Sequence, residues 1–151
     1  MAPFKIMTKQ ENDVVDTRSD RGLTILDIRS PKGISNATIE RVADSWPEQM
    51  EIHLHLKGLE SFSISCGTIT LRAAISSNNE GQKIRVWKDN QEEDLLNPKN
   101  PLFPDIRMMG GDGKIAKEIP LANGYFLIPI PKALLKENPK KIMLNWIDFY
   151  R

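Results

Sequence analysis

Two histidines, His53 and His55, are the first candidates for a metal-binding or catalytic role. Because the side chains of a β-strand alternate between its faces, a spacing of two places both imidazoles on one face. Zinc sites use such pairs, but a site also needs a third ligand, for which Glu51 or Glu60 would have to serve. The other interpretation is a solvated strand face on which the histidines are flanked by Glu51 and Lys57. The second interpretation is favoured, and we predict neither a metal nor another cofactor.

Three carboxylates stand beside apolar residues rather than in charged runs: Glu60, Asp105 and Asp148. A glycosidase needs two carboxylates at a defined separation, and nothing in the sequence sets any two of these at such a distance. The chain has no Gly-x-Ser-x-Gly motif. Residues 110–113 are rich in glycine but lack the lysine and the strand-to-helix setting of a phosphate-binding loop, and predict a turn. We therefore predict no catalytic residues, and an enzyme is the less favoured reading.

A tryptophan within residues 83–89 gives the most informative candidate for binding. Ile84 and Val86 point to one side of this predicted strand, which places Arg85, Trp87 and Asp89 on the other. A flat aromatic ring beside hydrogen-bonding groups suits a sugar, whose C–H face stacks on the ring while its hydroxyls bond to polar side chains. Two alternatives compete with such an exposed platform: the N-terminal segment covers Trp87, or the loop at residues 97–104 does.

Other residues with reactive or aromatic side chains are predicted to be structural. Cys66 follows Phe62 and Ile64 in phase, which indicates a small buried side chain rather than a reactive thiol. Trp46 precedes a proline and is expected to anchor the entry to a strand. Trp146 shares its phase with apolar neighbours and is expected in the core.

Most of these candidate residues fall on short predicted strands. Polar and apolar residues alternate most clearly at 50–57, 61–66, 68–75 and 83–89, and further strands are predicted at 23–28, 37–42, 106–109, 125–130 and 141–149. One short helix is expected over residues 131–137, from Pro131 to Glu137, because proline is favoured in a first turn. The pattern predicts an all-β fold, a β-sandwich of jelly-roll type, with a closed β-barrel as the alternative. Residues 1–21 are expected to form a polar N-terminal arm and residues 22–151 a single sandwich domain.

Composition excludes several classes of partner. The 151 residues carry 21 basic and 20 acidic side chains, a formal net charge of +1, without a basic stripe, so nucleic acid is not expected. No stretch reaches 18 apolar residues and no signal peptide is evident, so we predict a soluble protein without a membrane span, cytoplasmic by default. The single cysteine excludes an intrachain disulfide. Oligomeric state remains open.

Two resemblances add to this interpretation. The segment from Gly124 to Trp146, with its proline, an Ala-Leu-Leu-Lys helix and a final apolar strand, resembles the ending of galactose-binding-like jelly rolls. It departs from them where Asn138-Pro139 replaces a glycine-asparagine turn. Residues 30–34, 46–47, 56–60 and 146–151 resemble a family of uncharacterised bacterial proteins, a resemblance that implies no activity. The first resemblance implies that carbohydrate is a frequent ligand of such a fold, although fold alone does not assign function.

The sequence thus predicts a non-enzymatic β-sandwich binding module, with carbohydrate as the leading ligand class and Trp87, Arg85 and Asp89 as the binding residues. A structural or protein-interaction domain is the alternative. A small jelly-roll hydrolase or isomerase is the third possibility.

Overall fold

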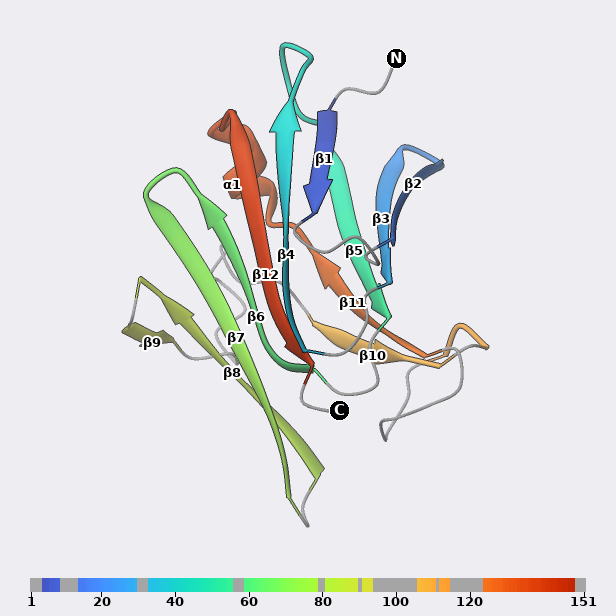
Figure 1. The fold of residues 1–151 in the computed structure, drawn as a ribbon, viewed down its shortest axis with the longest axis vertical. Coiled ribbons are helices and arrows are strands. Elements are labelled where there is room, and N and C mark those ends of the chain that lie inside the picture. Colours follow the sequence, from blue (N-terminus) through green and yellow to red (C-terminus); the bar gives the residue numbers. More distant parts are fainter. Residues whose placement is uncertain are drawn as a thin grey trace.

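The computed structural model describes residues 4–8, 14–29, 33–55, 59–78, 81–89, 91–93, 106–110, 112–114 and 124–148. In these residues the chain forms two β-sheets and one short helix, as the alternation predicted (Figure 1). The strands do not close into a barrel, so the sandwich is the architecture of the described part and the barrel alternative is wrong.

The larger sheet has seven strands. Their order across the sheet is β1 (Phe4–Thr8), β4 (Gly33–Arg41), β12 (Lys141–Asp148), β6 (Leu59–Cys66), β7 (Ile69–Asn78), β8 (Gly81–Lys88) and β9 (Gln91–Glu93). All pairs in this sheet are antiparallel. The long hairpin of β7 and β8 projects beyond the other strands at the lower end of Figure 1.

The smaller sheet has five strands. Their order is β10 (Arg107–Met109), β11 (Tyr125–Pro129), β5 (Gln49–His55), β3 (Leu23–Arg29) and β2 (Val14–Asp20). Strands β3 and β5 are parallel, and the other pairs in this sheet are antiparallel. The parallel pair is a departure from the fully antiparallel arrangement of a jelly roll.

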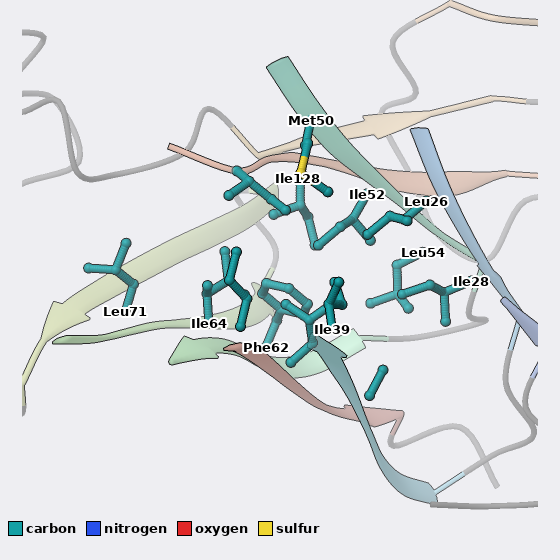
Figure 2. Close-up of a cluster of buried hydrophobic side chains, with 14 of the residues drawn as sticks. Leu26, Ile28, Ile39, Met50, Ile52, Leu54, Phe62, Ile64, Leu71 and Ile128 are labelled. Carbon is teal, nitrogen blue, oxygen red and sulfur yellow. The ribbon is translucent and has the colours of Figure 1, made fainter. Parts of the chain in front are cut away.

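The core lies between the two sheets. Leu26, Ile52 and Ile128 of the five-stranded sheet face Ile39 and Phe62 of the seven-stranded sheet, and all five are buried (Figure 2). Each belongs to the apolar phase of its strand, so burial of one face explains why the alternation specifies the sandwich. Trp146 and Cys66 lie in the same cluster, as predicted.

The helix α1 (Lys132–Lys136) connects the two sheets between β11 and β12. Leu134 and Leu135 are its buried residues, and the backbone oxygen of Leu134 accepts a hydrogen bond from the Cys66 thiol at 3.9 Å. Trp46 fixes the neighbouring segment, because its Nε1 donates to the Pro139 oxygen at 2.6 Å and its ring stacks on Phe4. None of the described helical residues forms a segment long and apolar enough to cross a bilayer.

The N-terminal residues differ from the predicted polar arm. Residues 4–8 form β1, which pairs with β4, and residues 14–20 form β2, which pairs with β3. The described side chains of β2 are all exposed, so this edge strand shows no burial pattern in sequence. The hairpin is also longer than the strands predicted at residues 68–75 and 83–89, because β7 extends to Asn78 and β8 begins at Gly81.

Candidate functional site

Trp87 lies on the outer face of the seven-stranded sheet. The buried Leu71 and Ala73 define the inner face of β7, and Trp87 is opposite Arg72, which has the other phase. The Arg72 guanidinium carbon lies 4.4 Å from the centre of the indole ring, and that of Arg85 lies 5.0 Å from it. The two cations therefore hold the ring through cation–π contacts. The indole is half-buried, and both arginines are exposed.

Asp89 ties the end of β8 to the neighbouring strand. Its carboxylate Oδ1 accepts a hydrogen bond from the Thr70 backbone N–H at 2.9 Å, and its own N–H donates to the Thr70 oxygen at 3.0 Å. The backbone of Asp89 has a φ of 49°, a left-handed conformation that aspartate tolerates better than most residues. Asp89 therefore fixes the wall of the site and uses one carboxylate oxygen to do so.

These side chains surround a recess. Thr70, Arg72, Trp87 and Asp89 line a hollow of about 240 Å³ on the outer face. Its walls combine part of an aromatic ring, a guanidinium group, a hydroxyl and a carboxylate. Such a mixture suits a small polar ligand with a flat apolar side, because the ring supplies contact area and the polar groups fix orientation.

The histidines lie on the outer face of the other sheet, and this face is not the solvated one that we predicted. His53 is only 6% exposed. The Tyr125 ring of β11 stacks on His53 at 4.6 Å between ring centres and lies 5.2 Å from His55. Tyr125 comes from a distant part of the chain, so alternation along β5 could not predict that it covers the histidines. Lys57, expected on the same face, lies outside the described residues.

A continuous polar network connects the two histidines. Nε2 of His53 donates to Glu51 Oε1 at 2.7 Å, and Nη2 of Arg18 donates to His53 Nδ1 at 3.3 Å. Because arginine only donates, Nδ1 must accept and the proton of neutral His53 resides on Nε2. The same Arg18 nitrogen lies 3.4 Å from Asp27 Oδ2, and Asp27 Oδ1 accepts from Nε2 of His55. Both carboxylates are thus engaged by imidazole and guanidinium groups.

Burial lowers the pKa of His55, and the Asp27 carboxylate opposes this effect in part. Its Nδ1 is buried and makes no hydrogen bond to the described residues. Nε2 of each histidine is occupied by a carboxylate, and the described residues contain no group of three or more side chains suited to hold a metal. The network is therefore arranged to fix side chains to one another.

A second hollow lies between the segment after β4 and α1. It has a volume of about 500 Å³, and Trp46, Glu48, Lys132 and Lys136 are among its lining residues. Trp46 is only 6% exposed and its N–H is already bonded to Pro139, so little of the indole remains for a ligand. This hollow is the larger of the two, yet it lacks the accessible aromatic surface of the Trp87 recess.

The structure brings together the three residues selected from the sequence. Arg85 contacts Trp87, and Asp89 lines the same recess. Arg72 and Thr70 of β7 were not selected as binding residues from the sequence, although the alternation already placed them on a polar face. Selecting them would have required the hairpin register that sets Arg72 opposite Trp87. The side chains of Glu60, Asp105 and Asp148, considered as acids or bases, lie outside what the structure describes.

Comparisons with known proteins supply no further assignment: no family model, no curated protein and no solved structure matches the chain.

Proposed function

We propose that this chain is a non-enzymatic β-sandwich binding module, of jelly-roll type apart from its parallel β3–β5 pair, whose ligand is carbohydrate held at the Trp87 recess. The observation that carries the proposal is the half-buried indole of Trp87 beside Arg72 and Thr70 in a hollow of about 240 Å³. A sugar ring would stack on the accessible part of the indole, while the guanidinium and hydroxyl groups bond to its hydroxyls. Arg85 steadies the ring from its own strand.

The expected affinity is modest. Stacking on one aromatic ring contributes about 0.5–1.5 kcal/mol beyond area burial, by analogy with aromatic pairs. Few other groups line the recess, so we expect dissociation constants on the order of micromolar to millimolar. Asp89 is expected to contribute mainly by shaping the recess, because one of its oxygens already accepts from the Thr70 amide.

The test is titration with a panel of soluble glycans, in which binding is measured by calorimetry and by tryptophan fluorescence. At least one glycan should give a saturable change, which Trp87→Ala abolishes and Trp87→Phe weakens. Val42→Ala, at an exposed position that does not line the recess, is the control and should bind as the parent does. If Trp87→Ala fails to fold, Arg72→Ala at an exposed position replaces it. Failure of every glycan to bind, or full binding by Trp87→Ala or its replacement, would refute the proposal.

Two exposed methionines favour the second candidate, a protein-interaction domain. Met7 is 51% exposed and Met143 is 46% exposed. Both are opposite Thr38 on the outer face of the seven-stranded sheet, one on each side. Flexible, polarisable methionines are common at surfaces that bind proteins. On this hypothesis Met143→Ser should abolish binding of a protein partner and leave glycan binding unchanged, whereas the carbohydrate module predicts a response to Trp87 variants only.

A further inference from the structure

A row of polar residues continues from the Trp87 recess across the seven-stranded sheet. Strand registers set Trp87 opposite Arg72, Arg72 opposite Ser63, Ser63 opposite Asn145 and Asn145 opposite Asn36. Four of them have the phase opposite to the buried core residues of their strands, and Trp87 is opposite one of these four, Arg72, so all five share the outer face. Ser63, Asn145 and Asn36 are half-buried and short.

The row is long enough for a ligand of several units. Adjacent strands lie about 4.8 Å apart, and four such spacings separate β8 from β4, which gives about 19 Å. Hydroxyl and amide groups both donate and accept hydrogen bonds, as sugar hydroxyls do. A chain that starts at the indole and runs perpendicular to the strands would meet one such group at β6, another at β12 and a third at β4.

Charge on this face favours an acidic ligand. Arg72 is exposed and rests against the ring of Trp87. A guanidinium stacked on an aromatic ring keeps its N–H edge free to bind, and its planar fork matches a carboxylate in two parallel hydrogen bonds. Two carboxylates of the face have other partners: Glu40 lies 3.9 Å from Lys141, and Asp89 accepts from the Thr70 amide. Glu92 of β9 is opposite Trp87 in the strand register, and its side chain lies outside what the structure describes.

We infer that the ligand is an acidic polysaccharide that lies across the strands, with a uronate carboxylate at Arg72 and the following sugar units over Ser63, Asn145 and Asn36. This inference rests on the proposed function and adds the ligand's charge, length and direction to it. The carboxylate distinguishes an acidic from a neutral glycan, and the polar row distinguishes a polymer from a single sugar.

The experiment uses calorimetry with oligogalacturonides of two to eight units and with the same oligomers after methyl esterification. The acidic oligomers should bind more tightly as length increases until the row is filled, and more weakly as salt is raised. Esterification should weaken binding about tenfold or more, because it removes the charge that the guanidinium pairs with. Arg72→Lys keeps the charge but loses the fork, and should also weaken binding several-fold.

Asn145→Ala tests the direction of the ligand. It should weaken binding of the long oligomers and leave that of the shortest unchanged, whereas Ser61→Ala, on β6 and the same outer face but outside the row, should affect neither. Thermal unfolding of each variant establishes that it is folded.

The outcomes separate the two proposals. If esterified oligomers bind as tightly as the acids and still require Trp87, the acidic ligand is wrong and the carbohydrate module stands. If Asn145→Ala has no effect at any length, the row is wrong. If no glycan of either kind binds, both proposals fail. Tighter binding of single-stranded oligonucleotides at the same site would also overturn the inference, because bases stack on aromatic rings and phosphates pair with arginine as well.

Discussion

Asp27 is the residue whose removal most directly tests the polar network of the five-stranded sheet. One carboxylate oxygen accepts a hydrogen bond from His55 Nε2, and the other lies 3.4 Å from Arg18 Nη2. Asp27→Ala removes both interactions without altering the apolar core, because Asp27 projects from the outer face. His55 would then have no acceptor for its Nε2 proton, and its Nδ1 already makes no hydrogen bond to the described residues.

The two lost interactions should differ in energy. The side chains of His55 and Asp27 are 14% and 18% exposed, so their hydrogen bond is shielded from water, and hydrogen bonds to charged groups contribute about 1.5–3 kcal/mol. The Arg18 side chain is 55% exposed, and an ion pair at such a position contributes at most about 1 kcal/mol. Asp27→Ala should therefore lower the free energy of unfolding by about 2–3 kcal/mol, with most of the loss from His55.

Asp16→Ala is the matched control. Asp16 lies opposite Asp27 on the edge strand β2 and is exposed, so the same change there should alter the free energy of unfolding by less than about 0.5 kcal/mol. Urea unfolding at pH 8, followed by tryptophan fluorescence, measures both variants. For a chain of this length the loss in Asp27→Ala corresponds to a decrease in Tm of about 4–12 °C.

A double-mutant cycle with His55→Phe isolates the pair. The two changes should be coupled by at least about 1.5 kcal/mol, because the second removes the group that the first leaves without a partner. Equal losses in Asp27→Ala and Asp16→Ala, or a coupling near zero, would show that the network does not stabilise the fold.

Three further predictions concern other parts of the molecule. Burial lowers the pKa of folded His55 below its ordinary value of about 6.5, so the unfolded chain takes up a proton first as the pH falls. The free energy of unfolding should therefore decrease below about pH 6.5. A decrease of equal size in His55→Phe would contradict this prediction. Trp46→Phe should lower the free energy of unfolding in urea by about 1–2 kcal/mol through loss of the hydrogen bond to Pro139. Val42→Ser, at an exposed position, should lower it by less than about 0.5 kcal/mol, and equal losses in the two variants would contradict the prediction. Cys66 is buried and its pKa is raised by burial, so the folded protein should react with Ellman's reagent more than about tenfold more slowly than the urea-unfolded chain, and similar rates would argue against this.

Alternation in the sequence predicted most of the strands that have one buried face, but not β1, where Phe4 is buried and Ile6 packs against the core. In β6, Phe62, Ile64 and Cys66 are buried while the serines between them face outward, so the pattern reports the fold directly. The edge strand β2 has no such pattern, because its described side chains are exposed. It joins the sheet by backbone pairing with β3 and by the contacts of Arg18 with Asp27 and His53. A polar edge strand and a polar arm look alike in sequence, and only the pairing separates them.

In the candidate site too, alternation within one strand could not predict the contacts made by other strands. Alternation placed Trp87, Arg85 and Asp89 on a common face, but the shorter of the two cation–π contacts to the indole comes from Arg72 on the neighbouring strand. The face of His53 and His55 was also predicted, and its burial was not, because Tyr125 comes from a strand far along the chain. Local sequence sets which side chains share a face, whereas strand order decides what covers them.

The two outer faces of the sandwich therefore differ in whether their hydrogen-bonding groups are available to a ligand. On the five-stranded sheet, Glu51 and Asp27 bond to His53, His55 and Arg18, so a ligand would have to break these bonds before it gained any. On the seven-stranded sheet, Arg72 rests on an aromatic ring, which holds the guanidinium in place without using its fork of N–H donors. Preorganised donors cost little conformational entropy on binding. A polar ligand should consequently prefer the seven-stranded face, and variants of the histidine network that remain folded should leave glycan affinity unchanged.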